Sequence, residues 1–557
     1  MFWNAWLRRA SSISLLILLV VLMIPPILWL VYGSFVSGVP WNPKEYTLLN
    51  YLKVLTDTRT LTALSNSVII SLGHTLLAIL IAFWLAWVTT RTNAPLRHIV
   101  EPLMPLTLLI PGFLVAIVWI LLLSPRIGLI NTFILPNLGL KGIVLNVYTL
   151  EGIIWVMGVY GVPIAYLMIA PALKNVDQSL EEASMILGAG GFTTLRRITF
   201  PLIKPAFLST FLLLFMLGIE SFDIPLYLGG QKIPVLTTEI FVRMKMYLPR
   251  DYGGATSIAM VTLLLTLLLV YLQRRVLREE YRFVTITGKG YRPALVDLGR
   301  WKYLVSLSII LLMLILVFAP LVILFIVSLF KRYPFSQLSD FTMESYYNVW
   351  AYPLVRNAFI NSFIIGVVAA TFAIILALFI SYYLVRTKAR LKTIVESLAM
   401  LGIAVPGIVF SLGFLWAYVG TPIYNTIWIL ILASLAKRIS WGVRFTIGGM
   451  MQIHPELEEC AKVLGSSWIR TFFKIICGIG KGWIVGGWLV ILLLVIRELA
   501  IPIILYTYGT EVISIIIYDM WDHGLYLETC ALSVILIAII AIVVIFVRKV
   551  LRIGITV

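Results

Sequence analysis

Residues 180–205 read LEEASMILGAGGFTTLRRITFPLIKP and carry acids and bases in a chain that is otherwise largely apolar. A related stretch, LEECAKVLGSSWIRTFFKIICGIGKG, occupies residues 457–482. In the first stretch an apolar stripe falls at helical spacing, on Leu180, Ala183, Ile186 and Leu187. Each stretch therefore predicts a short amphipathic helix, too short to cross a membrane, between two apolar runs. Because the segment occurs twice, the chain is expected to consist of two related halves.

The composition is that of an all-α polytopic membrane protein. Of 557 residues, 61% are hydrophobic and 12% are charged, and the mean hydropathy is +1.02. Runs long enough to cross a bilayer predict about twelve spans. Ten of these lie at 10–43, 60–90, 102–125, 152–173, 252–273, 303–330, 357–385, 529–547 and, as a pair joined by a turn at 420–425, within 397–436. The other two, 205–219 and 482–496, end at charged residues and are expected to continue as helices past them.

The formal net charge of +18 does not indicate a nucleic-acid partner. Basic residues gather where an even number of spans places the cytoplasm, as in WLRRA, RTNAPLRH, RTKARLK and RKVLR. This positive-inside bias predicts a multi-pass protein with both termini in the cytoplasm. Basic tracts beside anionic lipid account for the charge. The run 10–43 is too long for a signal-peptide core and lacks a small-residue cleavage site, so it predicts a retained first span.

The halves repeat in the same orientation. NSVIISLGHTLLAILIAFWLAWVTTRT, from Asn66, aligns with NSFIIGVVAATFAIILALFISYYLVRT, from Asn361, at an offset of 295 residues. Later the offset becomes 277, so the first half carries about 18 extra residues in an outer loop around 124–150. Six spans in each half make a parallel repeat with a pseudo-twofold axis along the membrane normal, which favours a central pathway. The predicted parts are a first repeat (1–273), a basic cytoplasmic linker (274–302) and a second repeat (303–557).

Two short patterns are not expected to form sites. The linker contains TGKG at 287–290, which lacks the first glycine, the following Ser or Thr and the preceding strand of a phosphate loop, so it predicts a turn. The three cysteines, Cys460, Cys477 and Cys530, show neither paired spacing nor a metal-ligand pattern.

Capping residues bound the short helix in each copy. In the first copy Asp177 or Ser179 can cap the start of a helix over about 177–191, and acids follow in the first turn, where the helix dipole favours them. Glycines at 188, 190 and 191 are expected to end it, and prolines at 201 and 205 to start the next span. In the second copy, over about 455–467, Pro455 is expected at the first helical position, and Gly478 and Gly482 replace the two later prolines.

A single helix of this kind would be interpreted as an interfacial helix lying among the lipid headgroups. Two copies at matching positions, each with an acid, a small residue and a glycine at fixed intervals, favour docking of a soluble partner.

The motif resembles a known one. The first copy, Glu182-Ala183-Ser184-x-x-x-Gly188-x9-Ile198-x-Phe200-Pro201, resembles the EAA loop of ABC importer permeases, whose pattern is Glu-Ala-Ala, three residues, Gly, nine residues, Ile-x-Leu-Pro. The second copy, Glu459-Cys460-Ala461-x-x-x-Gly465-x9-Ile475, matches up to the isoleucine and then departs. The resemblance extends over both halves. A fused chain of this length is most similar to ferric-iron transport permeases, as are GKGYRP (288–293) and VPGIVFSLGFLW (405–416); putrescine/spermidine, thiamine and phosphonate permeases are close relatives.

The resemblance implies a type I ABC importer permease of a prokaryotic plasma (inner) membrane that works by alternating access. Its short helices would couple to two cytoplasmic ABC ATPase subunits, and an extracytoplasmic substrate-binding protein would dock outside. ATP and Mg²⁺ would be bound by the partners, so no cofactor, metal site or catalytic residue is expected on this chain, and no enzymatic activity. The residues that would carry the coupling are Glu182, Ala183, Gly188, Pro201, Glu459, Ala461 and Gly465.

Charged residues inside the spans are functional candidates by default. They are Glu220, Asp223, Lys437, Arg438, Arg497 and Glu498. Two interpretations stay open. The residues pair internally, Glu220 with Arg497 or Glu498 with Lys437 or Arg438, or they line a translocation path for an anion or a cation. His74 is expected to be a polar residue in a helix interface rather than a ligand.

Other classes fit less well. A secondary transporter of the major-facilitator type also has twelve spans in parallel halves, but RTNAPLRH, after the second span, lacks the Gly-x-x-x-Asp-Arg pattern. A membrane-embedded enzyme would need clustered histidines or paired carboxylates, and the four histidines are scattered. A channel would need a repeated filter-like loop, which is absent from the sequence.

Overall fold

The computed structural model describes residues 5–39, 41–140, 142–280, 295–334, 341–387 and 391–551. The described chain is mainly helical, and its contacts divide it into two compact units, 56–239 with 264–343 and 1–55 with 240–263 and 344–557. We call these the first-core unit and the second-core unit. Helices α12 (Leu236–Lys245) and α13 (Tyr252–Glu280) each contribute residues to both units. The phosphate-loop-like residues 287–290 and the linker residues 288–293 lie outside the described residues.

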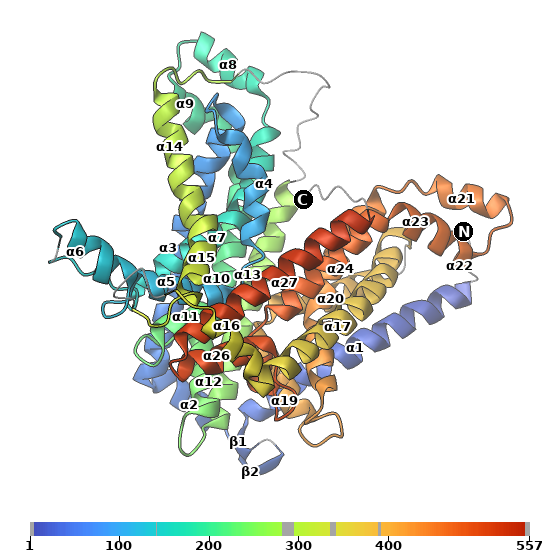
Figure 1. The fold of residues 1–557 in the computed structure, drawn as a ribbon. Coiled ribbons are helices and arrows are strands. Elements are labelled where there is room, and N and C mark those ends of the chain that lie inside the picture. The colour runs from blue at the N-terminus through green and yellow to red at the C-terminus, as the bar shows by residue number, and fades with distance from the viewer. Residues whose placement is uncertain are drawn as a thin grey trace. The chain divides into compact units, whose positions relative to one another are not determined.

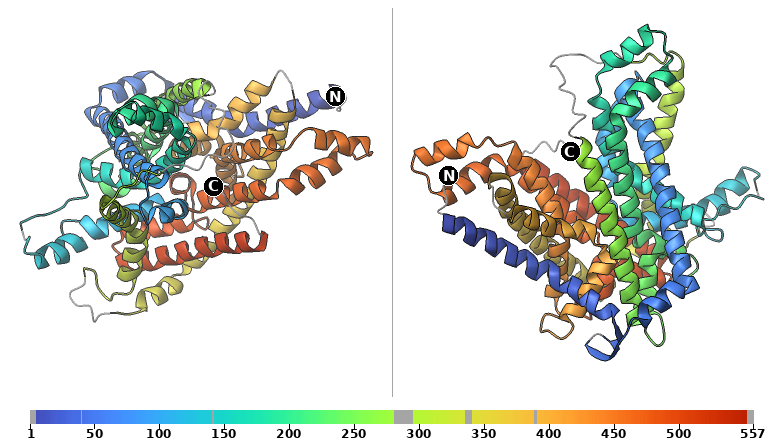
Figure 2. Two further views of the ribbon diagram at one scale, coloured as in Figure 1. Left: turned by 90° about the horizontal axis from the view of Figure 1, so that it is seen from above. Right: turned by 180° about the vertical axis from the view of Figure 1, so that it is seen from behind.

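The first-core unit is built on three long helices that pack against one another, α3 (Thr58–Arg91), α7 (Leu150–Lys174) and α10 (Phe200–Glu220) (Figures 1 and 2). Its other helices are α4 (Arg97–Thr107), α5 (Gly112–Leu123), η1 (Ile130–Ile134), α6 (Leu135–Asn137), α8 (Gln178–Ile186), α9 (Gly191–Thr194), η2 (Leu195–Thr199), α11 (Asp223–Gly229), α14 (Trp301–Met313), η3 (Leu314–Phe318) and α15 (Ala319–Ser328). The four η elements within the described residues are π-helical turns.

The second-core unit repeats this design with α17 (Pro353–Arg386), α20 (Ile427–Met451) and α24 (Lys481–Ile496) (Figure 1). Its other helices are α1 (Ala5–Ser34), α2 (Leu49–Thr56, whose last residue falls in the other unit), α16 (Glu344–Ala351), α18 (Lys392–Ala404), α19 (Gly407–Tyr418), α21 (Glu456–Val463), α22 (Trp468–Thr471), η4 (Phe472–Ile476), α23 (Cys477–Ile479), α25 (Pro502–Leu505), α26 (Ile513–Asp522) and α27 (Tyr526–Leu551). Strands β1 (Val36–Val39) and β2 (Asn42–Tyr46) form an antiparallel pair.

The sequence repeat reappears in the helix bounds. Helix α17 begins and ends 295 residues after α3, and α20 begins and ends 277 residues after α7. The first span of each repeat packs on helices of the other repeat. Helix α1, the first span of the first repeat, contacts α18 and α19 of the second, and α14 and α15, the first span of the second repeat, contact α4 and α5 of the first. The contact units therefore group the spans differently from a simple division of the sequence into 1–273 and 303–557.

Among the described residues, eight helices are long and apolar enough to cross a membrane, or eleven if each sharply bent pair forms one span. Helix α20 has the length of a span but carries Lys437, Arg438 and Arg444. Helix α20 corresponds to the twelfth expected span, the second of the pair within 397–436. The turn expected at 420–425 is present before it, and Asn425 adopts a left-handed conformation there (φ 62°).

Two of the expected spans are sharply bent, at matching places in the two halves. Helices α4 and α5 meet at 111°, and α18 and α19 meet at 109°. At both bends a proline, Pro111 or Pro406, has an extended backbone (ψ 146° and 145°) directly before the second helix. Proline also lacks the N–H that would continue the hydrogen bonding of the helix. The first helix therefore ends before the proline, and the second begins at the glycine that follows it.

Each of the two shorter spans continues as a helix past the charged residue at one of its ends only. Helix α10 ends at Glu220, because Ser221 has extended backbone angles, and α24 ends at Ile496. The additional helical length lies at their N-terminal ends, ahead of Lys204 and Lys481. The helical segment of α10 starts at Gly191, ahead of Pro201, and that of α24 starts at Trp468.

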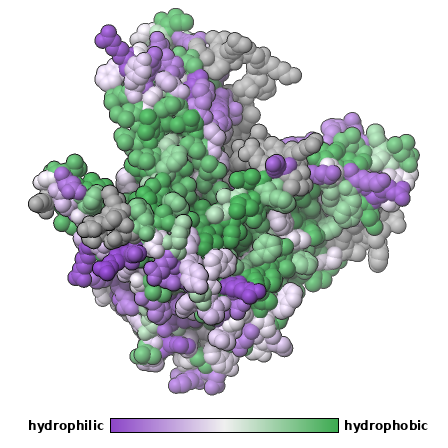
Figure 3. All heavy atoms as spheres, in the orientation of Figure 1, coloured by the Kyte–Doolittle hydropathy of each residue, from purple (hydrophilic) through white to green (hydrophobic). Residues whose placement is uncertain are grey.

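Apolar side chains cover the flank of the first-core unit, and hydrophilic side chains gather toward the end that carries α8 (Figure 3). On α3, Leu76, Leu80 and Trp84 form an exposed stripe at every fourth residue. An apolar stripe on the outside of a long helix is expected to face lipid.

Candidate functional site

The short helix α8 is bounded as its sequence predicts, but it is shorter than 177–191. The Asp177 carboxylate accepts a hydrogen bond from the Ser179 N–H (3.0 Å), and this bond lowers the pKa of Asp177 below its usual value. Gly188 ends the helix in the left-handed region (φ 85°). Its N–H donates to the Met185 carbonyl, and the Ala189 N–H donates to the Ser184 carbonyl (both 3.0 Å). This is a Schellman cap, which requires a residue that tolerates positive φ.

Helix α21 ends in the same way. Gly465 has a φ of 77°, and the Gly465 and Ser466 N–H groups donate to the carbonyls of Lys462 (2.8 Å) and Ala461 (3.0 Å). At its start Pro455 occupies the N-cap rather than the expected first helical position. The glycine of each motif copy is therefore the residue that stops the helix.

Both helices end in exposed apolar side chains. Ile186 and Leu187 are 85% and 87% exposed, and Val463 and Leu464 are 87% and 86% exposed. The two pairs stand 277 residues apart, which is the offset of the repeat. Surface side chains this apolar, repeated at the same place in both halves, mark an interaction surface.

The predicted coupling residues lie on or near these helices. Glu182 is half-buried and Glu459 is exposed, each at the second of two consecutive acids on its helix. Ala183 is exposed and Ala461 is half-buried. Pro201 lies in the first turn of α10, but the continuous helical segment already begins at Gly191, so the prediction that Pro201 starts the span is wrong.

The segments that lead into the membrane differ between the halves. Each contains a π-helical turn at the same repeat position, η2 and η4. After η4 the chain bends by 77° at Gly480, whereas no such bend follows η2. A β-carbon on Gly480 would lie 2.3 Å from the Trp483 ring, and one on Gly449 would lie 2.2 Å from it. The corner lies between Gly478 and Gly482, the two glycines that replace the prolines, and the Trp483 indole packs there between Gly480 and Gly449.

Each short helix is also bound to the inner end of a core helix. The Arg91 Nε of α3 lies 3.2 Å from the Glu181 carboxylate of α8, and the Arg386 Nε of α17 lies 2.6 Å from the Glu458 carboxylate of α21. The sequence analysis did not identify these residues. A signal was present, because the aligned repeats WVTTRT and YYLVRT both end in Arg-Thr and both motif copies begin Leu-Glu-Glu.

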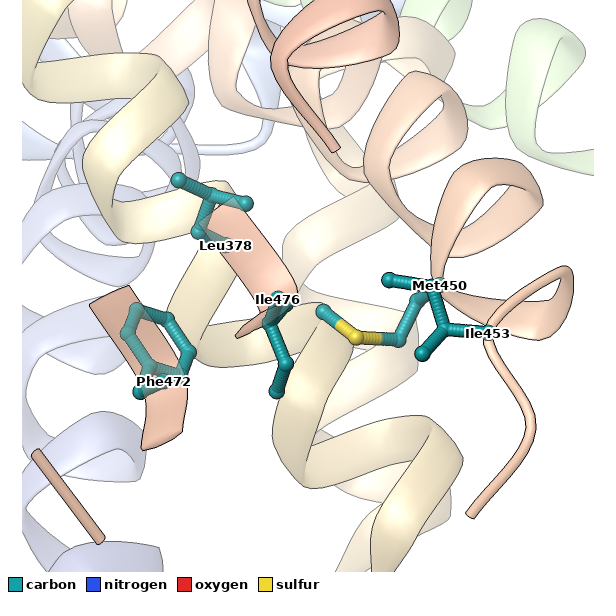
Figure 4. Packing of buried hydrophobic residues seen from close by; sticks show 5 residues of the cluster. All are labelled: Leu378, Met450, Ile453, Phe472 and Ile476. Atoms are coloured by element: carbon teal, nitrogen blue, oxygen red, sulfur yellow. The ribbon is translucent and has the colours of Figure 1, made fainter. Parts of the chain in front are cut away.

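A buried apolar cluster of the second-core unit includes Ile453, which lies shortly before α21. Leu378, Met450, Ile453, Phe472 and Ile476 pack together there (Figure 4). They join α17, the end of α20 and η4, and Tyr382 and Trp468 pack on their edge. The base of α21 is therefore fixed to the membrane-spanning core of its unit.

Two of the basic residues inside the second-core unit have partners within it. Arg438 forms an ion pair with Glu498 and donates to the Leu494 carbonyl (3.2 Å). Lys437 donates to the Val405 carbonyl (2.8 Å), at the break between α18 and α19. Of the pairings expected from the sequence, that of Arg438 with Glu498 is confirmed.

A related arrangement occurs at the matching break of the first-core unit. A β-carbon on Gly112 would lie 3.6 Å from an Asp223 carboxylate oxygen and 3.6 Å from the Tyr160 ring. A carboxylate near the start of α5 is favoured by the helix dipole. Glu220 lies in this unit and Arg497 in the other, and their pairing stays a prediction.

His74 occupies a helix interface, as expected. Its Nε2 lies 3.1 Å from the Leu214 carbonyl, and the ring fills the space beside Gly218. Among the described residues no group of three or more His, Cys, Asp or Glu side chains could hold a metal ion. The short helices, with their exposed apolar ends, can bind a partner and transmit its movement to the core helices. The buried charged residues can form part of a polar path.

Comparison with protein families gives one match. The sequence matches the family described as "Binding-protein-dependent transport system inner membrane component" twice, over residues 78–279 and 369–552. Each match contains most of one core and one copy of the short helix, α8 or α21.

Several characterised proteins are similar to the chain. The ferric transport system permease protein FbpB of Actinobacillus pleuropneumoniae is 25% identical over 96% of this chain and 77% of its own length. The putative ferric transport system permease protein FbpB 1 of Haemophilus influenzae is 26% identical over 84% and 73%. The sulfate transport system permease protein CysT of Escherichia coli is 24% identical over 46% of this chain and 87% of its own. A solved bacterial ABC transporter that imports alginate aligns with 48% of this chain at 20% identity and a TM-score of 0.39.

Proposed function

Because this chain belongs to the family of binding-protein-dependent transport system inner membrane components, we propose that it is the permease of an ATP-driven importer of ferric iron. The two fused repeats would supply both halves of the translocation path. Two cytoplasmic ATPase subunits, which bind ATP and Mg²⁺, and an extracytoplasmic substrate-binding protein complete the assembly. Both termini then lie in the cytoplasm, in keeping with the positive-inside bias.

The observation that carries the proposal is the matched pair of short helices with exposed apolar ends. The side chains of Ile186, Leu187, Val463 and Leu464 present two equivalent surfaces, one from each half. Two equivalent surfaces suit two equivalent partner subunits, and burial of each such side chain contributes roughly 1.5–3 kcal/mol. We therefore assign α8 and α21 as the coupling helices, each seated on one ATPase subunit.

Transport follows from motion of these helices. When ATP closes the two ATPase subunits, α8 and α21 move with them, and the spans rearrange between inward-open and outward-open states. The Schellman caps keep each coupling helix short and defined, so that it moves as a rigid piece. No residue of the permease needs to form a covalent bond with the substrate.

Ferric iron is proposed because relatives that span both halves are ferric transport permeases. The sulfate transport permease of Escherichia coli aligns with less than half of the chain. The pairing of Arg438 with Glu498 balances charge inside the second core, so that core is not simply an anion site. The charged residues Glu220, Asp223, Lys437, Arg438, Arg497 and Glu498 are proposed to lie along the path.

The test is a pull-down of the tagged chain from its native membrane, followed by uptake of ⁵⁵Fe(III)-citrate into cells. We expect an ABC ATPase subunit in the eluate, and we expect it to be lost when Ile186, Leu187, Val463 and Leu464 are all changed to Ser. The control is Tyr508→Ser, which changes a 94% exposed side chain elsewhere in the second-core unit. Absence of an ATPase with the wild-type chain would contradict the proposal, and uptake of ³⁵S-sulfate in place of iron would contradict the substrate.

A further inference from the structure

The acid that precedes the motif glutamate has the same partner in both halves. In the first copy this acid is Glu181, and in the second it is Glu458. Each forms an ion pair with the arginine that ends a core helix, Arg91 of α3 or Arg386 of α17. The arginines are 295 residues apart and the acids 277 residues apart, which are the two offsets of the repeat.

The first pair is largely removed from solvent. The Arg91 side chain is 5% exposed and that of Glu181 is 15% exposed. The Arg91 Nη2 also donates to the carbonyls of Leu173 (3.0 Å) and Val176 (3.2 Å), at the end of α7 and directly after it. The Thr199 hydroxyl donates to the other Glu181 oxygen (2.7 Å). One carboxylate thus joins α8 to α3 and to the π-helical turn that leads into α10.

The second pair joins the same repeat positions with a different accessory donor, and here the Arg386 Nε also donates a hydrogen bond to the Glu458 carboxylate (2.6 Å). The Arg386 Nη2 donates to the carbonyl of Ile453 (2.6 Å), which is the repeat counterpart of Val176. Tyr382, one turn earlier on α17, donates to the Glu458 carboxylate (3.1 Å). Its hydroxyl accepts from the Trp468 Nε1 (3.0 Å) at the start of α22.

The pair supplies a direct connection from each coupling helix to a core span. In the second-core unit the chain that follows α21 bends by 77° at Gly480 before it enters the membrane. A push along that chain is therefore not transmitted straight into α24. The contact of Glu458 with Arg386 bypasses this corner and reaches α17, which packs along both α20 and α24.

We propose that Arg91–Glu181 and Arg386–Glu458 are clamps that transmit the movement of the coupling helices to the inner ends of α3 and α17. This inference rests on the proposed coupling function. The four residues are positioning residues, which contact neither substrate nor ATP. The acids of the two clamps, Glu181 and Glu458, directly precede the motif glutamates Glu182 and Glu459 and hold the permease core.

The experiment measures movement of the two clamped helices. Spin labels are placed on Leu80→Cys in α3 and Ile375→Cys in α17, two exposed positions related by the repeat. The background replaces Cys460, Cys477 and Cys530, and the label-to-label distance is compared without nucleotide and with Mg-ADP-vanadate. The substrate plays no part in this readout.

The clamp variant is Glu181→Gln combined with Glu458→Gln, which removes the charge but keeps an oxygen for Thr199 and Tyr382. We expect this variant to retain the wild-type amount of ATPase. We also expect the fraction of molecules at the vanadate-induced distance to fall by about fivefold or more, which is the low end of ordinary coupling factors. Exchange of the charges, Arg91→Glu with Glu181→Arg and Arg386→Glu with Glu458→Arg, should recover part of that population. The matched control is Glu101→Gln, which breaks the exposed Lys174–Glu101 pair (2.8 Å) in the same unit.

The outcomes separate the clamp from the function on which it rests. If the clamp variant holds its ATPase and shifts like the wild type, or if Glu101→Gln abolishes the shift equally, the clamp is overturned. If the clamp variant fails to assemble with the ATPase, the charge-exchange variant decides between the two explanations. Recovered assembly together with recovered movement supports the clamp. Recovered assembly without movement, or no recovery of assembly, overturns it. If no ATPase binds the wild-type chain, the coupling function itself falls, and the clamp with it.

Discussion

Replacing Gly188 with Ala should fray the end of α8 without any steric clash. A β-carbon on Gly188 would meet no atom within 4 Å, so the cost comes from its left-handed backbone (φ 85°). An L-residue held in this region costs about 1–2 kcal/mol. If the last turn opens instead, it gives up the two cap hydrogen bonds from Gly188 and Ala189, at about 0.5–1.5 kcal/mol each. The two routes cost about the same, so the variant should show a loss of about 1–2 kcal/mol.

The assay is amide hydrogen exchange of the purified chain, followed over residues 185–189. A loss of about 1–2 kcal/mol corresponds to about a five- to thirtyfold rise in the opening equilibrium. The control is Gly191→Ala, which also has open space around it but lies at the first position of α9, where Ala suits a helix. If Gly188→Ala exchanges like the wild type, or if Gly191→Ala exchanges as fast as Gly188→Ala, the capping argument is refuted.

Three further changes test other parts of the structure. Glu182→Lys should weaken ATPase attachment more than Glu459→Lys, because the first copy leads into its span without the 77° bend of the second, and co-purified ATPase per chain measures this. Arg438→Met should lower stability by about 3–5 kcal/mol, measured as a fall in Tm in detergent, because it leaves the Glu498 carboxylate buried without its partner. Gly480→Ala should also lower Tm, because the new carbon would lie 2.3 Å from the indole ring three residues later.

Each of the three has its own control. Equal or reversed losses of ATPase from the two lysine variants would contradict the first. For the second, Arg438→Met combined with Glu498→Met should recover much of the lost stability, and a Tm unaffected by Arg438→Met alone would show that the pair contributes little. Gly478→Ala, which has open space in the same segment, should be neutral, and a loss equal to that of Gly480→Ala would contradict the third.

Periodic features could be predicted from the sequence. The offsets of 295 and 277 reappear as the bounds of α3 with α17 and of α7 with α20. The motif glycines could be recognised as helix ends, because glycine is the common residue at a left-handed cap. Both are local properties, which neighbouring residues determine.

Breaks and tertiary contacts could not be predicted in the same way. An apolar run reads alike whether its helix is straight or turns by 111°, so the bends at Pro111 and Pro406 were missed. The clamp from Arg91 to Glu181 joins residues far apart in the sequence, and nothing local distinguishes Glu181 from the neighbouring Glu182. The buried charges allowed several pairings, and the packing of α20 against α24 selected one of them.

The most direct test of the central claim is the native mass of the complex purified through a tag on this chain. A permease with both halves on one chain and two coupling helices should carry two ATPase subunits on one copy of the chain, and both should be lost when α8 and α21 lose their exposed apolar ends. A complex that holds two copies of this chain, or a chain that purifies without any ATPase from its native membrane, would contradict the account.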